Sequence, residues 1–195
     1  MIVASNNKGK IAEIAAILDG KFEVVSMYDV GLDVDIPEEG GTFEAHAKCK
    51  AVACSSLTGL PCLADDSGLV VDALGGEPGV DTALYAAKHG YKPDGMSKDE
   101  ANYTLLLSNM EGVQDRRAKF VCVMAYCDCS GRVSFGYGET LGRILDRPIG
   151  EGGFGYDPVF YSDELNMSFG VAANTAKNAV SHRKRALDDI SIRIM

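Results

Sequence analysis

Residues 2–10, Ile2-Val3-Ala4-Ser5-Asn6-Asn7-Lys8-Gly9-Lys10, join a short apolar run to the beginning of a helical pattern. Ile2 to Ala4 predicts a first β-strand, because a short apolar run bounded by polar residues is typical of one. Asn7 to Leu18 predicts a helix, since apolar side chains recur there at the spacing of one helical face. A strand that leads directly into a helix is a building unit of layered α/β proteins.

The same alternation continues outward along the chain. Further strands are predicted at Phe22–Ser26, Cys62–Ala64, Leu69–Ala73, Ala118–Tyr126 and Arg132–Leu141. Helices are predicted at Thr42–Leu57, behind a capping box that begins at Ser97, and at Ala179–Ile194. There is no internal repeat and no low-complexity linker, so we expect one α/β domain over residues 1–195.

The composition limits the classes of protein that fit. The 195 residues carry a formal net charge of −9, from 19 Lys and Arg against 28 Asp and Glu. Binding to duplex nucleic acid needs a broad basic surface, so we expect no nucleic acid polymer as a partner; a small polyanion in one basic pocket stays compatible. No apolar run approaches the roughly 20 residues of a membrane span, so we expect no membrane partner either.

The N-terminus and the cysteines indicate the compartment. Charges follow the first apolar stretch instead of preceding it, which is the reverse of a signal peptide, and we expect a cytoplasmic protein. The six cysteines include no Cys-x-x-Cys pair and there are only three histidines, which disfavours a zinc site. A chain of this size does not need disulfides, so we expect free thiols.

Four segments have residues suited to chemistry, and the first is the turn after the opening strand. A strand-to-helix turn presents free backbone N–H groups and the positive end of a helix dipole, which suits a phosphate chain. Polar side chains add donors, and the glycine allows close approach (Ser5, Asn6, Asn7, Lys8, Gly9, Lys10). The alternative is ordinary helix capping by Asn6 or Asn7.

The second segment, Asp65-Asp66-Ser67-Gly68, follows an apolar strand. Two adjacent carboxylates there repel each other, and such a pair usually serves a cation or a proton transfer. Mg²⁺ prefers one or two carboxylates together with phosphate oxygens and waters. The alternative is a turn with solvated acids, but the apolar residues on both sides favour the functional interpretation.

The third and fourth segments lie near the C-terminus. In Gly150–Pro158, glycines on both sides of Phe154 free the backbone to present the ring to a flat ligand, and Asp157 offers an acceptor; a flexible surface loop is the alternative. Lys177, with the basic run Ser181–Arg185, offers charge for an anionic ligand or donors for a keto oxygen. A solvated basic helix face is the alternative there.

Six motifs in this order resemble the inosine/xanthosine triphosphate pyrophosphatases, and the resemblance covers residues 2 to about 190. They are Ser5-Asn6-Asn7-Lys8-Gly9-Lys10, Glu38–Glu44, Ala64–Leu69, Leu74–Val80, Gly152–Phe160 and Lys177–Arg183. The resemblance implies an elongated, bent mixed sheet with flanking helices, two lobes around an active-site cleft, and a homodimer. It also implies Mg²⁺-dependent hydrolysis of the purine nucleoside triphosphates ITP, dITP or XTP to the monophosphate and pyrophosphate, by attack of water on the α-phosphorus.

The resemblance assigns roles to particular residues. Ser5, Asn7 and Lys10 would hold the triphosphate, within the turn that also contains Asn6, Lys8 and Gly9, and Lys50 would add a cation. Glu38, Asp66 and Asp65 would bind the metal, and Asp66 would activate the water. Ser67 would contact the substrate. The base would be stacked and enclosed by Phe154, Gly155, Tyr156 and Asp157, and read by Lys177, His182 and Arg183.

The implied specificity has a physical basis. Hypoxanthine and xanthine carry an oxygen at position 6, where adenine carries an amino group. Hydrogen-bond donors of the protein therefore pair with the 6-oxygen but face another donor when adenine is bound. An unpaired buried donor costs about 1–3 kcal/mol. Guanine keeps the 6-oxygen and must be rejected through its 2-amino group.

Two positions depart from the family pattern, and two alternatives remain open. Leu84 stands where the family usually has Arg, and residues 171–176 are neutral where the family is usually acidic. One alternative is a septum-formation-inhibitor-like nucleotide pyrophosphatase with another base preference. The other is a non-catalytic nucleotide-binding module.

Overall fold

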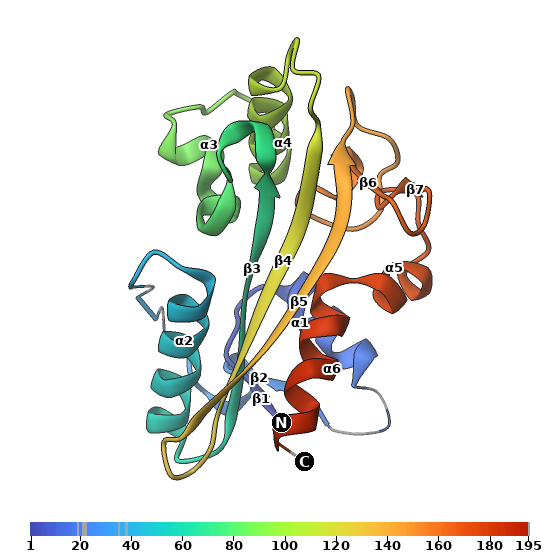
Figure 1. Cartoon of the computed structure of the whole chain (residues 1–195). Helices are drawn as coiled ribbons and strands as arrows, with labels where there is room; N and C mark the ends of the chain where they lie inside the picture. Colours follow the sequence, from blue (N-terminus) through green and yellow to red (C-terminus); the bar gives the residue numbers. More distant parts are fainter. Residues whose placement is uncertain (19, 21–22, 35, 38, 195) are drawn as a thin grey trace. The chain divides into compact units, whose positions relative to one another are not determined.

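The computed structural model describes residues 1–18, 20, 23–34, 36–37 and 39–194 (Figure 1). Its strands are β1 Ile2–Val3, β2 Val25–Ser26, β3 Cys62–Val71, β4 Arg117–Cys127, β5 Val133–Ile144, β6 Phe160–Ser162 and β7 Met167–Ser168. Its α-helices are α1 Lys8–Ile17, α2 Phe43–Thr58, α3 Tyr85–Lys88, α4 Lys98–Asn109, α5 Asn174–Val180 and α6 His182–Ile194. Short 3₁₀ segments are η1 Tyr28–Val30, η2 Asp72–Leu74, η3 Gly79–Leu84 and η4 Asp157–Val159.

The strands form one mixed sheet of seven, in the order β2-β1-β3-β4-β5-β6-β7. β1 pairs in parallel with both β2 and β3, whereas β6 pairs antiparallel with β5 and β7. The parallel pairs require crossovers, and α1 and α2 lie in those connections. The predicted α/β class with a mixed sheet and flanking helices is confirmed; the elongated shape and the lobes about a cleft stay predictions.

The chain divides into two compact units. Unit 1 comprises Met1–Ser67, Cys122–Gly138 and Ser181–Met195, and unit 2 comprises Gly68–Val121 and Glu139–Val180. β3, β4 and β5 each contribute residues to both units.

The core of unit 1 follows from the alternation of side chains along its strands. Ala64 of β3 and Val123 of β4 pack with α2, whereas their neighbours Leu63 and Met124 pack with α1 and α6. The sheet therefore has an α2 face and an α1/α6 face in this unit (Figure 1). By the same alternation, Asp66 belongs to the α2 face and Asp65 to the α1/α6 face.

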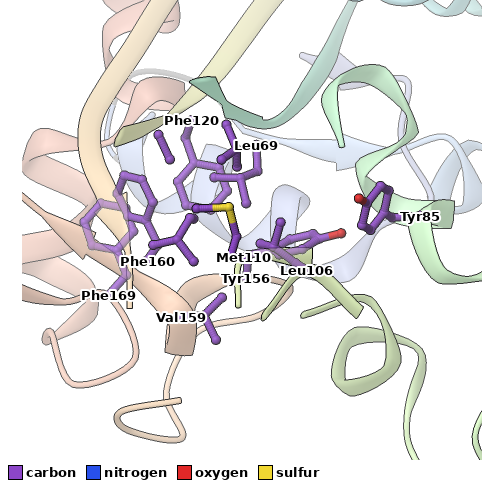
Figure 2. Packing of buried hydrophobic residues seen from close by; sticks show 12 residues of the cluster. Leu69, Tyr85, Leu106, Met110, Phe120, Tyr156, Val159, Phe160 and Phe169 are labelled. Carbon is purple, nitrogen blue, oxygen red and sulfur yellow. The ribbon is translucent and has the colours of Figure 1, made fainter. Parts of the chain in front are cut away.

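The core of unit 2 is a single cluster of apolar side chains around three phenylalanines (Figure 2). The ring centroids of Phe120 and Phe160 lie 4.6 Å apart, and those of Phe160 and Phe169 lie 5.1 Å apart. Leu106 and Met110 attach α4 to this cluster. The helix and its capping box at Ser97 are confirmed.

Several elements differ from the sequence prediction. The single helix expected over Ala179–Ile194 is wrong: α5 and α6 are separate, and Ser181 between them accepts a hydrogen bond from the Lys184 N–H at 3.1 Å. Serine favours this capping role over a helix interior. The strand at Phe22–Ser26 is confirmed only for Val25–Ser26; Phe22 lies outside the described residues. β3 is one continuous strand through Asp65 and Asp66, and β6 and β7 were not predicted.

Two further expectations can be compared with the structure. All six cysteines are free, as predicted, and four of them are buried. Within the described ranges, no helix is both long and apolar enough to cross a membrane.

Candidate active site

The turn between β1 and α1 combines a helix cap with exposed donors. Asn7 caps α1, because its side chain accepts a hydrogen bond from the Lys10 N–H at 3.1 Å, and its own N–H donates to Ser5 Oγ. Asn6 and Lys8 are exposed, and Gly9 is partly exposed. The capping alternative is therefore realised at Asn7, while the first turn of α1 stays accessible to a ligand.

Asp66 is buried on the α2 face of the sheet. Its Oδ1 lies 2.8 Å from Lys50 Nζ and its Oδ2 lies 3.3 Å from His46 Nδ1. Lys50 and His46 are one turn apart on α2, so both side chains reach the same carboxylate. This helix forms because Thr42 caps its first turn and the left-handed Gly59 ends it.

Asp65 is buried on the opposite face, against α1 and α6. Its Oδ2 lies 3.1 Å from Lys10 Nζ, 3.3 Å from Arg183 Nη2 and 3.0 Å from Ser67 Oγ. Arg183 is only 1% exposed, and it also pairs with Glu13 of α1 and donates to Ser67 Oγ. Acids and bases therefore alternate in a buried chain of ion pairs.

This arrangement sets the charge states of the buried groups. Burial alone raises the pKa of Asp65, but Lys10, Arg183 and Lys50 outweigh it and hold that pKa well below its ordinary value. Burial lowers the pKa of Arg183, and the carboxylates of Asp65 and Glu13 more than offset this and raise it. Both Asp65 and Arg183 are therefore charged at neutral pH.

The geometry of the strand places the adjacent carboxylates of Asp65 and Asp66 among different side chains, and the cation or proton-transfer role expected for the pair stays a prediction. Consecutive residues of a β-strand point to opposite faces, and Asp65 and Asp66 have separate cationic partners. Lys50, the ion-pair partner of Asp66, also helps to lower the pKa of Asp65, so the two carboxylates are electrostatically linked.

The donor set is compatible with Mg²⁺, which takes one or two carboxylates and completes its shell with phosphate oxygens and water. Asp65 Oδ1 is buried without a hydrogen-bond partner among the described residues, which leaves a hard oxygen for a cation. Among all the residues that the structure describes, no group of three or more Asp, Glu, His or Cys side chains is placed to hold a metal ion. Glu38, the third expected ligand, lies outside the described residues.

In unit 2, Asp157 organises the aromatic loop. Its Oδ2 accepts hydrogen bonds from the Phe154 N–H at 2.8 Å and from Lys177 Nζ at 2.6 Å. Lys177 Nζ also lies 4.8 Å from the centroid of the Phe154 ring. Asp157 and Lys177 are both almost completely buried. A Cβ at Gly153 would collide with Asp157 Oδ2, so this glycine is required for the carboxylate to reach the loop.

Two more contacts fasten the loop. The Tyr156 hydroxyl donates to the Thr82 carbonyl at 3.0 Å, and burial raises the pKa of this tyrosine. The Gly155 N–H donates to Asp99 Oδ2 at 2.8 Å. Leu84, at the end of η3, is 49% exposed.

The structure thus groups the predicted residues into two sets. The unit 1 set is Lys10, Lys50, Asp65, Asp66, Ser67 and Arg183, with His182 buried in the same unit; the unit 2 set is Phe154, Gly155, Tyr156, Asp157 and Lys177. Arg183 forms ion pairs with Asp65 and Glu13.

Sequence reasoning missed four partners of these sets: Glu13, His46, Thr82 and Asp99. For two of them a signal existed, because Glu13 follows Lys10 by three positions and His46 precedes Lys50 by four, which are helical neighbours. Thr82 and Asp99 had no signal, since their contacts join segments distant in the sequence.

Known proteins similar to this chain were found by sequence and by structure. A sequence model of the Ham1 family matches residues 1–192. The chain is 48% identical to a dITP/XTP pyrophosphatase of Geobacter sulfurreducens, covering 96% of this chain and 92% of the relative. Identity to the protein of the same name from Desulforamulus reducens is 44%, with coverage of 96% and 91%. The solved Staphylococcus aureus Ham1 protein has a TM-score of 0.83 and 36% identity over 99% of this chain and 96% of that chain.

Proposed function

The chain belongs to the Ham1 family, and from that premise we propose that it is a dITP/XTP pyrophosphatase. It hydrolyses deaminated purine nucleoside triphosphates (ITP, dITP and XTP) to the monophosphate and pyrophosphate, and so cleanses the nucleotide pool. The observation that carries the proposal is the buried Asp66 carboxylate held between Lys50 and His46. A carboxylate fixed in this way suits the activation of a water molecule.

The unit 1 set binds the triphosphate in this proposal. Lys10 and Lys50 are the proposed cations for the phosphate oxygens, and each forms an ion pair with a carboxylate. The first turn of α1, with Ser5, Asn7 and the neighbouring backbone N–H groups, adds uncharged donors. Ser67 contributes a hydroxyl beside Asp65.

The two carboxylates have different tasks. Asp65 Oδ2 already interacts with Lys10, Arg183 and Ser67, so this residue orients cationic and polar groups. Asp66, to which the family resemblance assigns water activation, is the proposed acceptor of the proton of the attacking water at the α-phosphorus. Pyrophosphate leaves from the opposite side of that phosphorus.

Mg²⁺ is the proposed cofactor, and the family resemblance assigns it to Asp66, Asp65 and Glu38. When bound, the ion would neutralise charge on the phosphate oxygens. Removal of divalent cations with a chelator is expected to stop pyrophosphate release, and added Mg²⁺ to restore it. Full activity after chelation would contradict the metal requirement.

The unit 2 set binds the base. Phe154 stacks on the purine, and Lys177 donates to the 6-oxygen while its bond to Asp157 fixes its position. Adenine offers an amino group there, and leaving a buried donor unpaired costs about 1–3 kcal/mol. Base reading by His182 and Arg183 stays a prediction; the ion pairs of Arg183 favour Lys177 as the principal reader.

One experiment separates this function from its alternatives. Purified protein is incubated with Mg²⁺ and a panel of ITP, dITP, XTP, ATP, GTP and modified pyrimidine triphosphates, and the release of pyrophosphate and orthophosphate is measured. Pyrophosphate from the deaminated purines is the expected result. Preference for modified pyrimidines would favour the septum-formation-inhibitor-like alternative, binding without hydrolysis would favour the binding module, and orthophosphate as the direct product would refute attack at the α-phosphorus.

We also propose a cytoplasmic homodimer. The free thiols support a reducing compartment, and the dimer rests on the family resemblance. Light scattering is expected to give about twice the 20.7 kDa of one chain.

A further inference from the structure

The loop that carries Phe154 is fastened on both sides of this residue. On one side, Asp157 accepts the Phe154 N–H from within the core. On the other, Asp99 accepts the Gly155 N–H at 2.8 Å. The peptide that joins Phe154 to Gly155 is thus held by a carboxylate outside the loop.

Asp99 is suited to this task by its position in α4. Ser97 caps the helix, and the capping box uses the side chain of the next residue, Glu100, whose Oε2 accepts the Ser97 N–H at 2.7 Å. The cap therefore does not need Asp99, whose carboxylate reaches Gly155, 56 positions away in the sequence. Leu106 and Met110 fix the helix to the core of unit 2, while Asp99 itself is exposed.

Gly155 is matched to this contact. Its φ of +62° lies in the left-handed region, which residues with a side chain adopt only with strain. In this conformation the Gly155 N–H donates to Asp99. A hydrogen bond to an ionised acceptor is stronger than one between neutral groups. The contact therefore stabilises one conformation of a glycine-rich segment that would otherwise adopt several.

We propose that Asp99 is a positioning residue for the base end of the substrate, which it serves by fixing the Phe154–Gly155 peptide. The kinetic consequence of this inference rests on the proposed function, whereas the contact between Asp99 and Gly155 does not. Asp99 does not contact the substrate itself, so its removal weakens recognition of the base and leaves the chemical step and the phosphate contacts unchanged.

The test compares three variants. Asp99→Ala removes the acceptor, and Asp99→Asn keeps a side-chain oxygen that accepts the same N–H. Glu100→Ala is the matched control, because it removes a carboxylate from the same helical turn and breaks the capping box without touching Gly155. We measure KM and kcat for ITP, and the inhibition constants of the products IMP and pyrophosphate.

Loss of one such hydrogen bond is expected to raise KM for ITP and the inhibition constant of IMP about five- to tenfold in Asp99→Ala. The value of kcat and the inhibition constant of pyrophosphate stay unchanged, because neither depends on the base. Asp99→Asn restores affinity to near the wild-type value. Glu100→Ala lowers the melting temperature without changing KM.

A readout independent of hydrolysis is the exchange rate of the Gly155 amide hydrogen, followed by ¹⁵N NMR. It rises in Asp99→Ala and stays unchanged in Glu100→Ala. If the wild-type protein released no pyrophosphate from any deaminated purine triphosphate, the proposed function would fail while this measurement still tested the anchor. Equal KM increases in Asp99→Ala and Glu100→Ala, or unchanged Gly155 exchange in Asp99→Ala, would overturn the inference.

Discussion

Asp65 and Asp66 are adjacent in the chain but act on opposite faces of the sheet. Asp66 meets Lys50 and His46 of α2, and Asp65 meets Lys10 of α1 and Arg183 of α6. The separation follows from the alternation of side chains along a strand. In the proposed mechanism, one carboxylate orients neighbouring groups while the other accepts the proton of the attacking water.

Asp66→Asn is expected to reduce pyrophosphate release from ITP by at least about a hundredfold, because the amide cannot accept the proton of the attacking water. The amide keeps the size of the side chain, so the fold should persist, as checked by circular dichroism and thermal unfolding. Near-full Mg²⁺-dependent activity in this variant would contradict the role of Asp66.

Arg183→Met is expected to lower the free energy of unfolding by about 3–5 kcal/mol, because it removes the buried guanidinium that pairs with both Asp65 and Glu13. Urea unfolding measures the change. Arg193→Met is the matched control on the same helix, since Arg193 is exposed and its partner Asp189 is partly exposed. The control should lose no more than about 1 kcal/mol. Equal losses would show that the ion pairs of Arg183 add little stability.

At the scale of elements, β5 and α6 touch through backbone. A Cβ on Gly136 or Gly138 would collide with main-chain atoms of α6, at Ala186 O and His182 O respectively. These glycines let the helix lie directly on the strand. The first turn of α6 carries His182 and Arg183, so this contact also positions the site.

Gly138→Ala is expected to destabilise the protein by about 1–3 kcal/mol through overpacking. It should also lower pyrophosphate release, because displacement of α6 moves Arg183 away from Asp65. Urea unfolding and steady-state kinetics test the two effects. Ser134→Ala on the same strand is the control and should change neither; a Gly138→Ala protein with native stability would refute the close packing.

The aromatic loop leads to a prediction at the same scale. Phe154→Ala is expected to raise KM for ITP about tenfold or more through lost stacking on the base. Its stability should change little, because Phe154 is only partly buried. Phe169→Ala is the contrasting variant: this ring is fully buried in the core of unit 2, and its loss should cost about 3–5 kcal/mol. Unchanged kinetics in Phe154→Ala would remove the stacking role.

At the scale of the whole molecule, three strands belong to both compact units. A strand cannot lose its partners in one unit without weakening its ladder in the other. We therefore propose that the chain folds as one domain, as the sequence led us to expect.

A single urea transition is the expected outcome, with coincident midpoints by far-UV circular dichroism and by tyrosine fluorescence, which is usable because the chain has no tryptophan. Two separate transitions would show that the units unfold independently.

The net charge of −9 can be compared with where the cations of the two residue sets lie. The cations of the two sets, Lys10, Lys50, Lys177 and Arg183, are largely buried and paired with acids. The net charge therefore describes the outer surface. A net negative charge disfavours the broad basic face that duplex binding needs.

Local sequence patterns predicted the fold class, the family and many of the candidate site residues. The helical spacing at residues 7–18, the capping box at Ser97 and the alternation of strands and helices predicted the α/β class. The six motifs identified the family and most members of both residue sets. Failures arose where local signals were ambiguous: Ser181 lies within a helical pattern but acts as a cap, and β6 and β7 are too short to have a period.

Only the tertiary structure decided which groups meet. Lys50 and Asp66 are 16 positions apart, and Arg183 and Asp65 are 118 apart. No sequence period links such pairs, because their contact depends on how strands and helices pack against one another. The sequence by itself determined which charges this protein carries; packing assigned Asp66 to α2, Asp65 to α1 and α6, and Gly155 to Asp99, since a buried charge is stable only beside a partner that the fold supplies.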